Sequence, residues 1–352
     1  MKVLGISAFY HDSAAAIIYN GRIIAAAQEE RFSRKKNDSS FPRQAIEYCI
    51  CEADKISQEP VDYIAFYDQP FLVLDRFIHN VHALGKESSD LIDFSYDNLF
   101  GKRLWVHEYV KKYMTENTKF FTIKHHISHA ASAFYPSPYA KSIILTMDGV
   151  GEWSTLSIGI GLQNKIELKE ELKYPQSLGL FYSAFAYFCG FKVNSDEYKF
   201  MGLASYGKPR YYDLICKNII DIKTDGSFLL NMDFFDYIKG TSMINERKMS
   251  EIFGGGRRLP DAPITRREID IAASVQKITS DIIIKIARYA KKKYGDGINY
   301  LVMAGGVALN CVANGILRDC KIFDNIWIQP AAGDAGAALG AALYLYYQIL
   351  GN

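Results

Sequence analysis

The sequence lacks an excess of charge of either sign. Lysine and arginine number 41 and aspartate and glutamate 39, so the net charge of the 352-residue chain is +2. A protein that binds nucleic acid through its phosphates carries a basic excess, so nucleic acid is not an expected partner. The six cysteines are scattered, with no CxxC pair, which predicts free thiols in a reducing compartment.

Long hydrophobic runs are also missing. The most apolar stretch, residues 335–347, has 13 residues and directly follows Asp334. It is too short to span a bilayer and predicts a buried helix. The start, MKVLGISAFYHD, shows no small-residue cleavage motif of a secretory signal. We therefore expect a cytoplasmic protein with no membrane partner.

The composition is that of a folded globular protein. Hydrophobic residues make up 49% of the chain, aromatic residues 14% and charged residues 23%. Such a chain buries a sizeable core without a disulfide or a structural metal. Its length suggests two domains or one large duplicated domain.

The order of predicted elements occurs twice. The first unit has three β-strand patterns, and Asn20-Gly21 predicts a tight hairpin between the second and third. The second unit repeats the order strand, polar turn, strand, tight turn, strand. The strands are expected at 2–8, 14–19 and 22–28, and again at 142–149, 154–162 and 165–174. The sequence therefore predicts an α/β fold of two βββαβα lobes with a central cleft.

The remaining segments complete the two lobes. We expect a helix at 41–52 and a strand at 61–67, then a helical insertion at 68–118. A long amphipathic helix is expected at 266–294, with strand-to-helix units after 298 and 325. Residues 207–260 are expected to be irregular, with the run Gly254 to Gly256 as a flexible loop. The lobes are assigned to 1–138 and 139–352, and the terminal helix is expected to pack back on the first lobe.

A histidine cluster is the first candidate site. His125 and His129 are four residues apart, so a helix would place both imidazoles on one face, where they suit one metal ion. Asp148 and Asp334 each follow an apolar strand and adjoin a glycine. Strand ends face the cleft in open α/β sheets, so the two carboxylates are candidates to complete the site. Mixed histidine and carboxylate ligation favours Fe²⁺, Mn²⁺ or Zn²⁺ over Mg²⁺.

Glycine turns are the second candidate. Gly305-Gly306 follows a strand and opens a helix, where backbone N–H groups can bind phosphate or ribose. The segment EYKFMGLASYG offers Glu197, Lys199 and Gly202 in a short span. His11-Asp12-Ser13 forms a reactive polar turn in the first hairpin. A packed histidine cluster, Asx turns and plain polar turns are the structural alternatives.

Six ordered blocks resemble the NodU/CmcH-type O-carbamoyltransferases. They cover essentially the whole chain and read HDSAAAIIYNGRIIAAAQEERFSRKKND, HHISHAASAFYPSPY, LTMDGVGEWST, DEYKFMGLASYGKP, GGVALNCVANGIL and AAGDAGAALGAAL. The resemblance implies the duplicated ATPase fold of actin, sugar kinases and heat-shock chaperones, similar to the tRNA threonylcarbamoylation ATPase.

The resemblance also assigns roles to residues. It implies a metal held by His125, His129, Asp148 and Asp334, with Fe²⁺ favoured and Mg²⁺, Mn²⁺ and Zn²⁺ as alternatives. It places ATP or carbamoyladenylate at the set Glu197, Lys199, Gly202, Gly305, Gly306 and Asn310. His11 and Asp12 match the turn beside the reacting phosphate, and either is a candidate general base.

Two departures from the family stand out. Asn37 stands where the family usually has histidine, so any role of that histidine is lost. Family members also continue into a YrdC-like domain that makes carbamoyladenylate from carbamoyl phosphate and ATP, and the chain ends before it. We therefore expect a separate YrdC-like domain or subunit to supply this step, so that carbamoyl phosphate is used only indirectly.

The expected function is O-carbamoyl transfer from carbamoyladenylate to a hydroxyl of a small-molecule acceptor, a natural product or a sugar. A threonylcarbamoyl transferase acting on tRNA would share the metal and nucleotide blocks but needs a basic face. A non-catalytic nucleotide-binding partner subunit is a second alternative. A sugar kinase is a third, but it would not need the histidine pair. The acceptor is not identified by the sequence, and a homodimer stays open.

Overall fold

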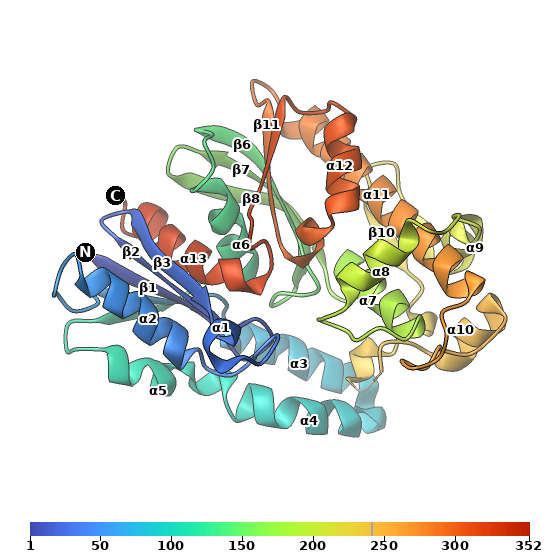
Figure 1. Ribbon diagram of the computed structural model, residues 1–352, viewed down its shortest axis with the longest axis horizontal. Helices are drawn as coiled ribbons and strands as arrows, with labels where there is room; N and C mark the ends of the chain where they lie inside the picture. The colour runs from blue at the N-terminus through green and yellow to red at the C-terminus, as the bar shows by residue number, and fades with distance from the viewer. Residues whose placement is uncertain (241) are drawn as a thin grey trace.

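Figure 1 shows two lobes, each built on a five-stranded sheet flanked by helices. This computed structural model describes residues 1–240 and 242–352. The strands of the first sheet are β1 (Lys2–Ser7), β2 (Ala14–Tyr19), β3 (Arg22–Gln28), β4 (Tyr63–Phe66) and β5 (Lys119–Thr122). Those of the second are β6 (Lys141–Met147), β7 (Ser154–Leu162), β8 (Lys165–Lys173), β11 (Tyr300–Ala304) and β12 (Asn325–Ile328).

The two sheets share one topology. The strand order is β3-β2-β1-β4-β5 in the first sheet and β8-β7-β6-β11-β12 in the second. In each sheet the first three strands pair antiparallel, and the last two run parallel to the first strand. This repetition confirms the predicted duplication and the α/β fold class.

The tight hairpin predicted between the second and third strands is confirmed. Asn20 and Gly21 join β2 to β3 with φ angles of 47° and 77°. Both residues therefore lie in the left-handed region, which a two-residue type I′ hairpin turn requires at both central positions. The helix predicted over 266–294 is also confirmed as α11 (Arg266–Tyr294), which begins at a capping box formed by Thr265 and Glu268.

The last helix of each unit packs on the sheet of the other lobe. α6 (His125–Phe134) follows β5 but lies against β6 and β11 of the second sheet. α13 (Asp334–Tyr344) follows β12 but lies against β1 and β2 of the first. The two helices also pack extensively on each other, as the red and green helices between the lobes show (Figure 1). This exchange ties the lobes together.

Two glycines permit these close contacts. A Cβ on Gly5 of β1 would lie 1.9 Å from the carbonyl oxygen of Ala338 in α13. A Cβ on Gly340 of α13 would lie 1.8 Å from the carbonyl oxygen of Ser128 in α6. Because these distances are far below van der Waals contact, any side chain would push α13 away from its neighbours.

The apolar stretch at 335–347 forms most of α13, as predicted, and the helix is buried against the first sheet. Its alanines, Ala337, Ala341 and Ala342, join the core of the first lobe. Within residues 1–240 and 242–352, no helix is both long and apolar enough to cross a membrane.

Each lobe carries additional helices. In the first, α1 (Glu30–Ser33) and α2 (Arg43–Asp54) follow β3. The segment predicted as a helical insertion contains α3 (Pro70–Leu84), α4 (Ser89–Ser95) and α5 (Val106–Val110). Between and after them lie the short 3-10 helices η1 (Gly85–Ser88), η3 (Arg103–Trp105) and η4 (Lys111–Tyr113) and the π-helix η2 (Tyr96–Phe100). In the second lobe, α7 (Leu178–Phe188), α8 (Glu197–Ala204) and α12 (Cys311–Asp319) surround α11.

The expectation that residues 207–260 are irregular is wrong. The segment contains α9 (Tyr212–Asn218), the hairpin β9 (Ile220–Ile222) and β10 (Phe228–Leu230), and α10 (Glu246–Phe253). α10 is amphipathic, because Met249 and Phe253 lie one turn apart and are both buried. Gly254, read as part of a loop, is the left-handed residue that ends this helix (φ 70°).

Replacing Gly340 by alanine is predicted to destabilise the protein by at least about 2 kcal/mol, because overpacking an interior contact costs roughly 1–3 kcal/mol. Urea unfolding would measure the change in the free energy of unfolding. The matched control is Gly315→Ala in α12, where an added Cβ meets no atom within 4 Å. That control should stabilise by about 0.5–1 kcal/mol. Equal effects at the two sites would contradict the close α6–α13 contact.

Candidate functional site

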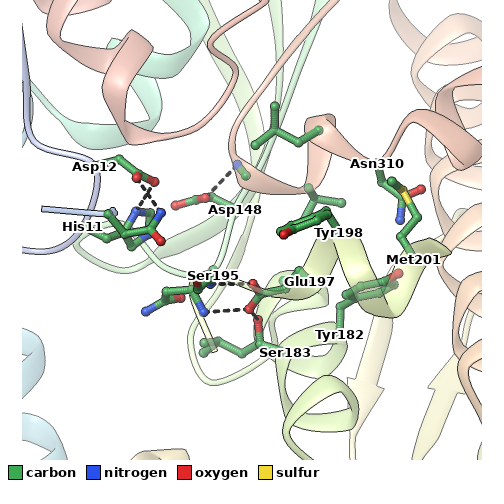
Figure 2. Close-up of a pocket in the computed structure, with 18 of the residues that line it drawn as sticks. His11, Asp12, Asp148, Tyr182, Ser183, Ser195, Glu197, Tyr198, Met201 and Asn310 are labelled. Atoms are coloured by element: carbon green, nitrogen blue, oxygen red, sulfur yellow. Dashed lines mark hydrogen bonds and ion pairs between the residues drawn. The ribbon is translucent and has the colours of Figure 1, made fainter. Parts of the chain in front are cut away.

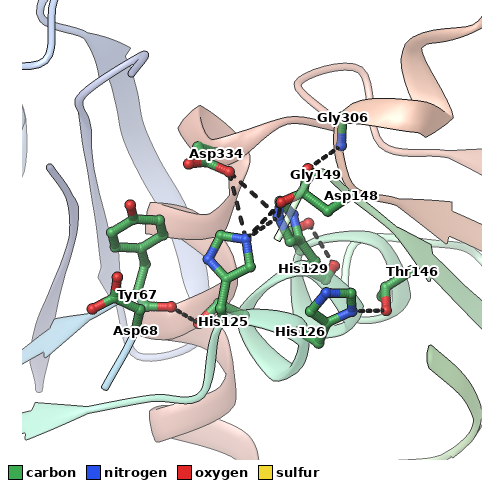
Figure 3. Close-up of polar contacts among 12 residues, drawn as sticks. Tyr67, Asp68, His125, His126, His129, Thr146, Asp148, Gly149, Gly306 and Asp334 are labelled. Atoms are coloured by element: carbon green, nitrogen blue, oxygen red, sulfur yellow. Dashed lines mark hydrogen bonds and ion pairs between the residues drawn. The ribbon is translucent and has the colours of Figure 1, made fainter. Parts of the chain in front are cut away.

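Four side chains from three different elements meet between the lobes (Figure 3). His125 and His129 lie one turn apart at the start of α6, Asp148 follows the end of β6, and Asp334 is the first residue of α13. One ligand atom from each lies within 4.8 Å of the others. The structure thus brings together the four residues proposed from the sequence as metal ligands.

The distances within this cluster are short. The Nε2 atoms of His125 and His129 are 3.0 Å apart. His125 Nε2 is also 3.0 Å from Asp148 Oδ2. Asp334 Oδ1 lies 3.6 Å from His125 Nε2 and 3.5 Å from His129 Nε2. All four residues are buried.

The cluster leaves polar atoms without protein partners. Within the described part of the chain, neither carboxylate oxygen of Asp334 accepts a hydrogen bond, although both are buried. Both oxygens of Asp148 have partners, because Oδ1 accepts a hydrogen bond from the backbone N–H of Gly306 at 2.8 Å and Oδ2 lies 3.0 Å from His125 Nε2. Buried polar atoms without partners are uncommon in folded proteins. A cation between the two imidazole nitrogens and the two carboxylates would satisfy them, so this donor set fits a divalent metal.

The charges of the cluster reinforce one another. Burial opposes charge on His129, but the carboxylates of Asp148 and Asp334 outweigh burial and raise the His129 pKa to about 9. In turn, the two histidines overcome burial and hold the pKa of Asp148 well below its usual value. The cluster is therefore a concentrated negative site that attracts protons or a metal cation.

His126 belongs to a different environment. Its Nδ1 lies 2.7 Å from Thr146 Oγ1 and 3.1 Å from Ser157 Oγ, on the second sheet. Burial lowers the His126 pKa to about 3, so this ring is neutral at physiological pH. His126 anchors α6 to the sheet and is not one of the four clustered side chains.

His11 and Asp12 lie at the edge of the cluster. His11 Nδ1 is 2.9 Å from Asp12 Oδ2, and His11 Nε2 is 4.0 Å from Asp334 Oδ2. Burial works against a charged His11, yet Asp334 and Asp12 raise its pKa to about 9. Asn37 donates from Nδ2 to Asp12 Oδ1 at 2.8 Å. Asn37 thus orients Asp12.

A cleft runs from this pair into the second lobe (Figure 2). At one end it is lined by Tyr10, His11, Asp12 and Asp148. The other end is more apolar and is lined mainly by Leu180, Tyr182, Tyr198, Met201, Val307 and Leu309. A cleft with one apolar end and one polar end suits a ligand with an aromatic base and an anionic group.

Three of the predicted nucleotide-binding residues line this cleft. Gly306 lies beside Asp148, while Glu197 and Asn310 lie further along. Gly305 forms the turn immediately before Gly306. Its φ is 93°, and a Cβ at this position would lie 2.2 Å from the carbonyl oxygen of Met147. Only glycine fits at that position.

Glu197 and Asn310 already have protein partners. Glu197 accepts hydrogen bonds from Ser183 Oγ and from the backbone N–H groups of Asn194 and Ser195, at 2.8–2.9 Å. The two groups make different contributions: the Glu197 carboxylate orders the loop that leads into α8, and the Asn310 side chain supports the start of α12. Asn310 accepts from Ala313 N and exchanges two hydrogen bonds with Gln276.

Lys199 and Gly202 do not line the cleft. Lys199 Nζ pairs with Asp196 Oδ1 at 2.8 Å on a half-exposed part of α8, and a Cβ on Gly202 would meet no atom within 4 Å. The same helix instead presents Tyr198 and Met201 to the cleft. Their spacing of three residues was the helical signal for this face, which the sequence analysis missed.

Comparison with known proteins identifies a family and several relatives. Residues 2–343 match a family described as the carbamoyltransferase N-terminus. The chain is 49% identical to the Synechocystis protein sll1178, over 99% of this chain and 58% of that protein. It is 31% identical to the nodulation protein NolNO of Sinorhizobium fredii, over 96% of this chain and 46% of that protein.

A further relative has an activity in its name. The 3′-hydroxymethylcephem-O-carbamoyltransferase of Amycolatopsis lactamdurans is 22% identical over 95% of this chain and 57% of that protein. The chain thus spans about half the length of the curated relatives it matches. Among solved structures, component A of the Acidaminococcus fermentans (R)-2-hydroxyglutaryl-CoA dehydratase aligns over 99% of both chains with a TM-score of 0.49 and 16% identity.

If the cluster binds one divalent ion, His125→Ala and Asp334→Ala should each remove it, because each deletes one of four ligands. Elemental analysis of the purified protein would measure the bound metal per chain. The matched control is His126→Asn, since His126 is adjacent and buried but contacts Thr146 instead. It should keep the metal. Full metal occupancy in the His125 or Asp334 variant would remove the cluster as the metal site.

Proposed function

The chain belongs to the carbamoyltransferase family through its match to the N-terminal domain, and we propose that it transfers a carbamoyl group from carbamoyladenylate to a hydroxyl of a small-molecule acceptor. The cephem O-carbamoyltransferase supports an oxygen acceptor. The proposal depends above all on one observation: a single cleft has Tyr198 and Met201 at its apolar end and His11, Asp12 and Asp148 at its polar end.

The polar end of the cleft suits the phosphoryl group of an adenylate. Gly306 opens the turn after β11, and Gly149 follows Asp148; both line this end. Such turns bring backbone N–H groups close to phosphate oxygens without a side chain between them. The apolar end then takes the adenine, with Tyr198 as a stacking surface and Met201 beside it.

His125, His129, Asp148 and Asp334 would hold a divalent cation, Fe²⁺ being favoured by the mixed nitrogen and oxygen ligands and Mg²⁺, Mn²⁺ and Zn²⁺ being the alternatives. Such an ion supplies Lewis acidity and neutralises phosphate charge. The chain's own contribution is to exclude water from the cluster, because all four side chains are buried.

In the proposed reaction the acceptor oxygen attacks the carbamoyl carbon. The new bond joins that carbon to the acceptor oxygen, the bond from the carbon to the phosphate oxygen breaks, and AMP leaves. The hydroxyl proton passes to a general base, for which His11 and Asp12 are both placed. Because Asp334 and Asp12 raise the pKa of His11 to about 9, His11 accepts this proton only in its neutral form, at alkaline pH. Holding both reactants in one cleft makes their reaction effectively unimolecular, which contributes to the rate enhancement.

The transfer step can be tested with preformed carbamoyladenylate. AMP release and the mass of the product would be followed with a panel of hydroxyl compounds. Removal of the base, by His11→Gln or Asp12→Asn, should lower kcat by roughly 10²–10⁴-fold. The control is Asp213→Asn, on an exposed position of α9. Failure of the wild-type protein to carbamoylate any hydroxyl, or unchanged kcat in both variants, would contradict the proposed function.

The nucleotide part can be tested by thermal unfolding. AMP should raise the melting temperature of the wild-type protein, as a ligand of the native state does. Tyr198→Ala should weaken AMP binding by about 1–3 kcal/mol, the usual loss when a stacking aromatic side chain is removed. Both Tyr198 and the control Tyr206 are largely exposed, so neither substitution should disturb the core. If Tyr206→Ala weakens AMP binding as much as Tyr198→Ala does, the adenine does not bind at the apolar end of the cleft.

A further inference from the structure

Thr279 of α11 is a buried polar residue in the wall of the cleft. Its side chain is fully buried, yet it is one of the residues that line the cleft. Within residues 1–240 and 242–352, its Oγ1 atom has no hydrogen-bond partner, and no other residue that lines the cleft has a buried side-chain nitrogen or oxygen atom in this state. Buried hydroxyl groups are normally hydrogen-bonded, so this hydroxyl group is free to bind a ligand.

The hydroxyl group of Thr279 differs from those of its neighbours on α11. Ser274 Oγ donates to the main-chain oxygen of Asp270 at 2.6 Å, and Ser280 Oγ donates to that of Gln276 at 2.9 Å. Serine and threonine inside a helix commonly make this bond to the carbonyl group one turn earlier. In the described part of the chain Thr279 makes no such bond, so its own helix does not use the hydroxyl group.

The preceding turn of α11 places Thr279 at the apolar end of the cleft. Gln276, three residues earlier, accepts hydrogen bonds at Oε1 from the Tyr182 hydroxyl and from Asn310 Nδ2, both at 3.0 Å. Tyr182 and Asn310 line this end of the cleft (Figure 2). Residues three apart lie on one face of a helix, so Thr279 faces the same space. Because the other three side chains are hydrogen-bonded to one another, Thr279 is the one that needs a partner.

The exposure of the lining residues places Thr279 on the inner side of this end. Tyr198, the proposed stacking surface for adenine, is 56% exposed, whereas Tyr182 is 7% exposed and Thr279 is fully buried. A base that enters along Tyr198, with its sugar and phosphate towards the polar end, brings the edge opposite the sugar to the inner wall. In adenine this is the Watson–Crick edge, which carries N1 and the 6-amino group.

Resting on the proposed function, we propose that the hydroxyl group of Thr279 forms a hydrogen bond with the Watson–Crick edge of adenine and makes the site specific for a base with a polar atom there. A hydroxyl group both donates and accepts, so it can donate to N1 or accept from the 6-amino group. Tyr198 and Met201 contact the face of a base, and such stacking tolerates any base. A buried hydroxyl group discriminates, because a ligand that lacks the matching atom leaves it unpaired.

Three nucleotides distinguish the two possible hydrogen bonds. They are AMP, purine riboside 5′-monophosphate, which lacks the 6-amino group, and 1-deaza-AMP, in which carbon replaces N1. Titration calorimetry should show that AMP binds about threefold to tenfold more tightly than at least one analogue, the range for a hydrogen bond between neutral groups. Weaker binding of purine riboside 5′-monophosphate identifies the 6-amino group, and weaker binding of 1-deaza-AMP identifies N1. Equal affinities for all three nucleotides would overturn the proposal.

Thr279→Val tests the residue itself, because valine has the same shape without the hydroxyl group. AMP should bind this variant about threefold to tenfold more weakly, and the preference for AMP over the analogue should disappear. The free variant should be at least as stable as the wild-type protein, because an unpaired buried hydroxyl group is replaced by an apolar one. Thr279→Ser should keep the preference. An unchanged preference in Thr279→Val, or an equal loss of affinity for all three nucleotides, would overturn the proposal.

The matched control is Ser142→Ala. Ser142 of β6 also has a buried hydroxyl group without a partner in the described part of the chain, but it does not line the cleft. Its removal should leave the preference for AMP intact. If Ser142→Ala changes the preference as much as Thr279→Val does, the effect does not come from contact with the base, and the proposal is wrong.

Nucleotide binding and carbamoyl transfer fail separately. If the protein carbamoylates no hydroxyl compound but shows a preference for AMP that depends on Thr279, the proposed transfer fails and the contact with the base stands. If it carbamoylates a hydroxyl compound but Thr279→Val leaves the preference unchanged, the contact fails and the proposed function stands. A wild-type protein that does not bind AMP at all would overturn the contact.

Discussion

The contact between α6 and α13 is the constraint on which the site depends. Each helix begins where its own lobe ends and packs on the sheet of the other lobe. Gly340 allows the two backbones to approach so closely that a Cβ would lie 1.8 Å from Ser128 O. Because His125 and Asp334 each begin one of these helices, the packing of the helices sets the distance between ligands from the two halves of the chain. The duplication thus creates a site that neither half contains alone.

The same arrangement explains the chemistry of the cleft. The second lobe contributes Asp148 and the turn at Gly306, while the first contributes His11 and Asp12 from its equivalent hairpin. The duplicated hairpins have therefore diverged: one supplies a carboxylate to the cluster, and the other supplies groups placed to handle a proton. Burial intensifies their interactions, because water does not screen charges inside the cluster.

Much of this could be predicted from the sequence. Asn20-Gly21, the repeated strand patterns and the helical spacing of residues 266–294 are local signals, and the structure confirms them. The four clustered residues were found from the four-residue spacing of His125 and His129 and from the positions of Asp148 and Asp334 after apolar strands. The environments of other residues depend on packing that no local pattern records. Glu197 and Asn310 form hydrogen bonds with Ser183 and Gln276, and Lys199 pairs with Asp196 and does not line the cleft.

The central claim is that the cluster and the cleft form one site, with a metal ion next to the phosphate of the nucleotide. The most direct measurement is ³¹P relaxation of AMP bound to the protein loaded with paramagnetic Mn²⁺. A metal ion next to the phosphate should strongly enhance the ³¹P relaxation rate, and the enhancement should disappear in His125→Ala while AMP still binds. AMP that binds to the Mn²⁺-loaded protein without any enhancement would place the metal away from the phosphate and contradict a single site.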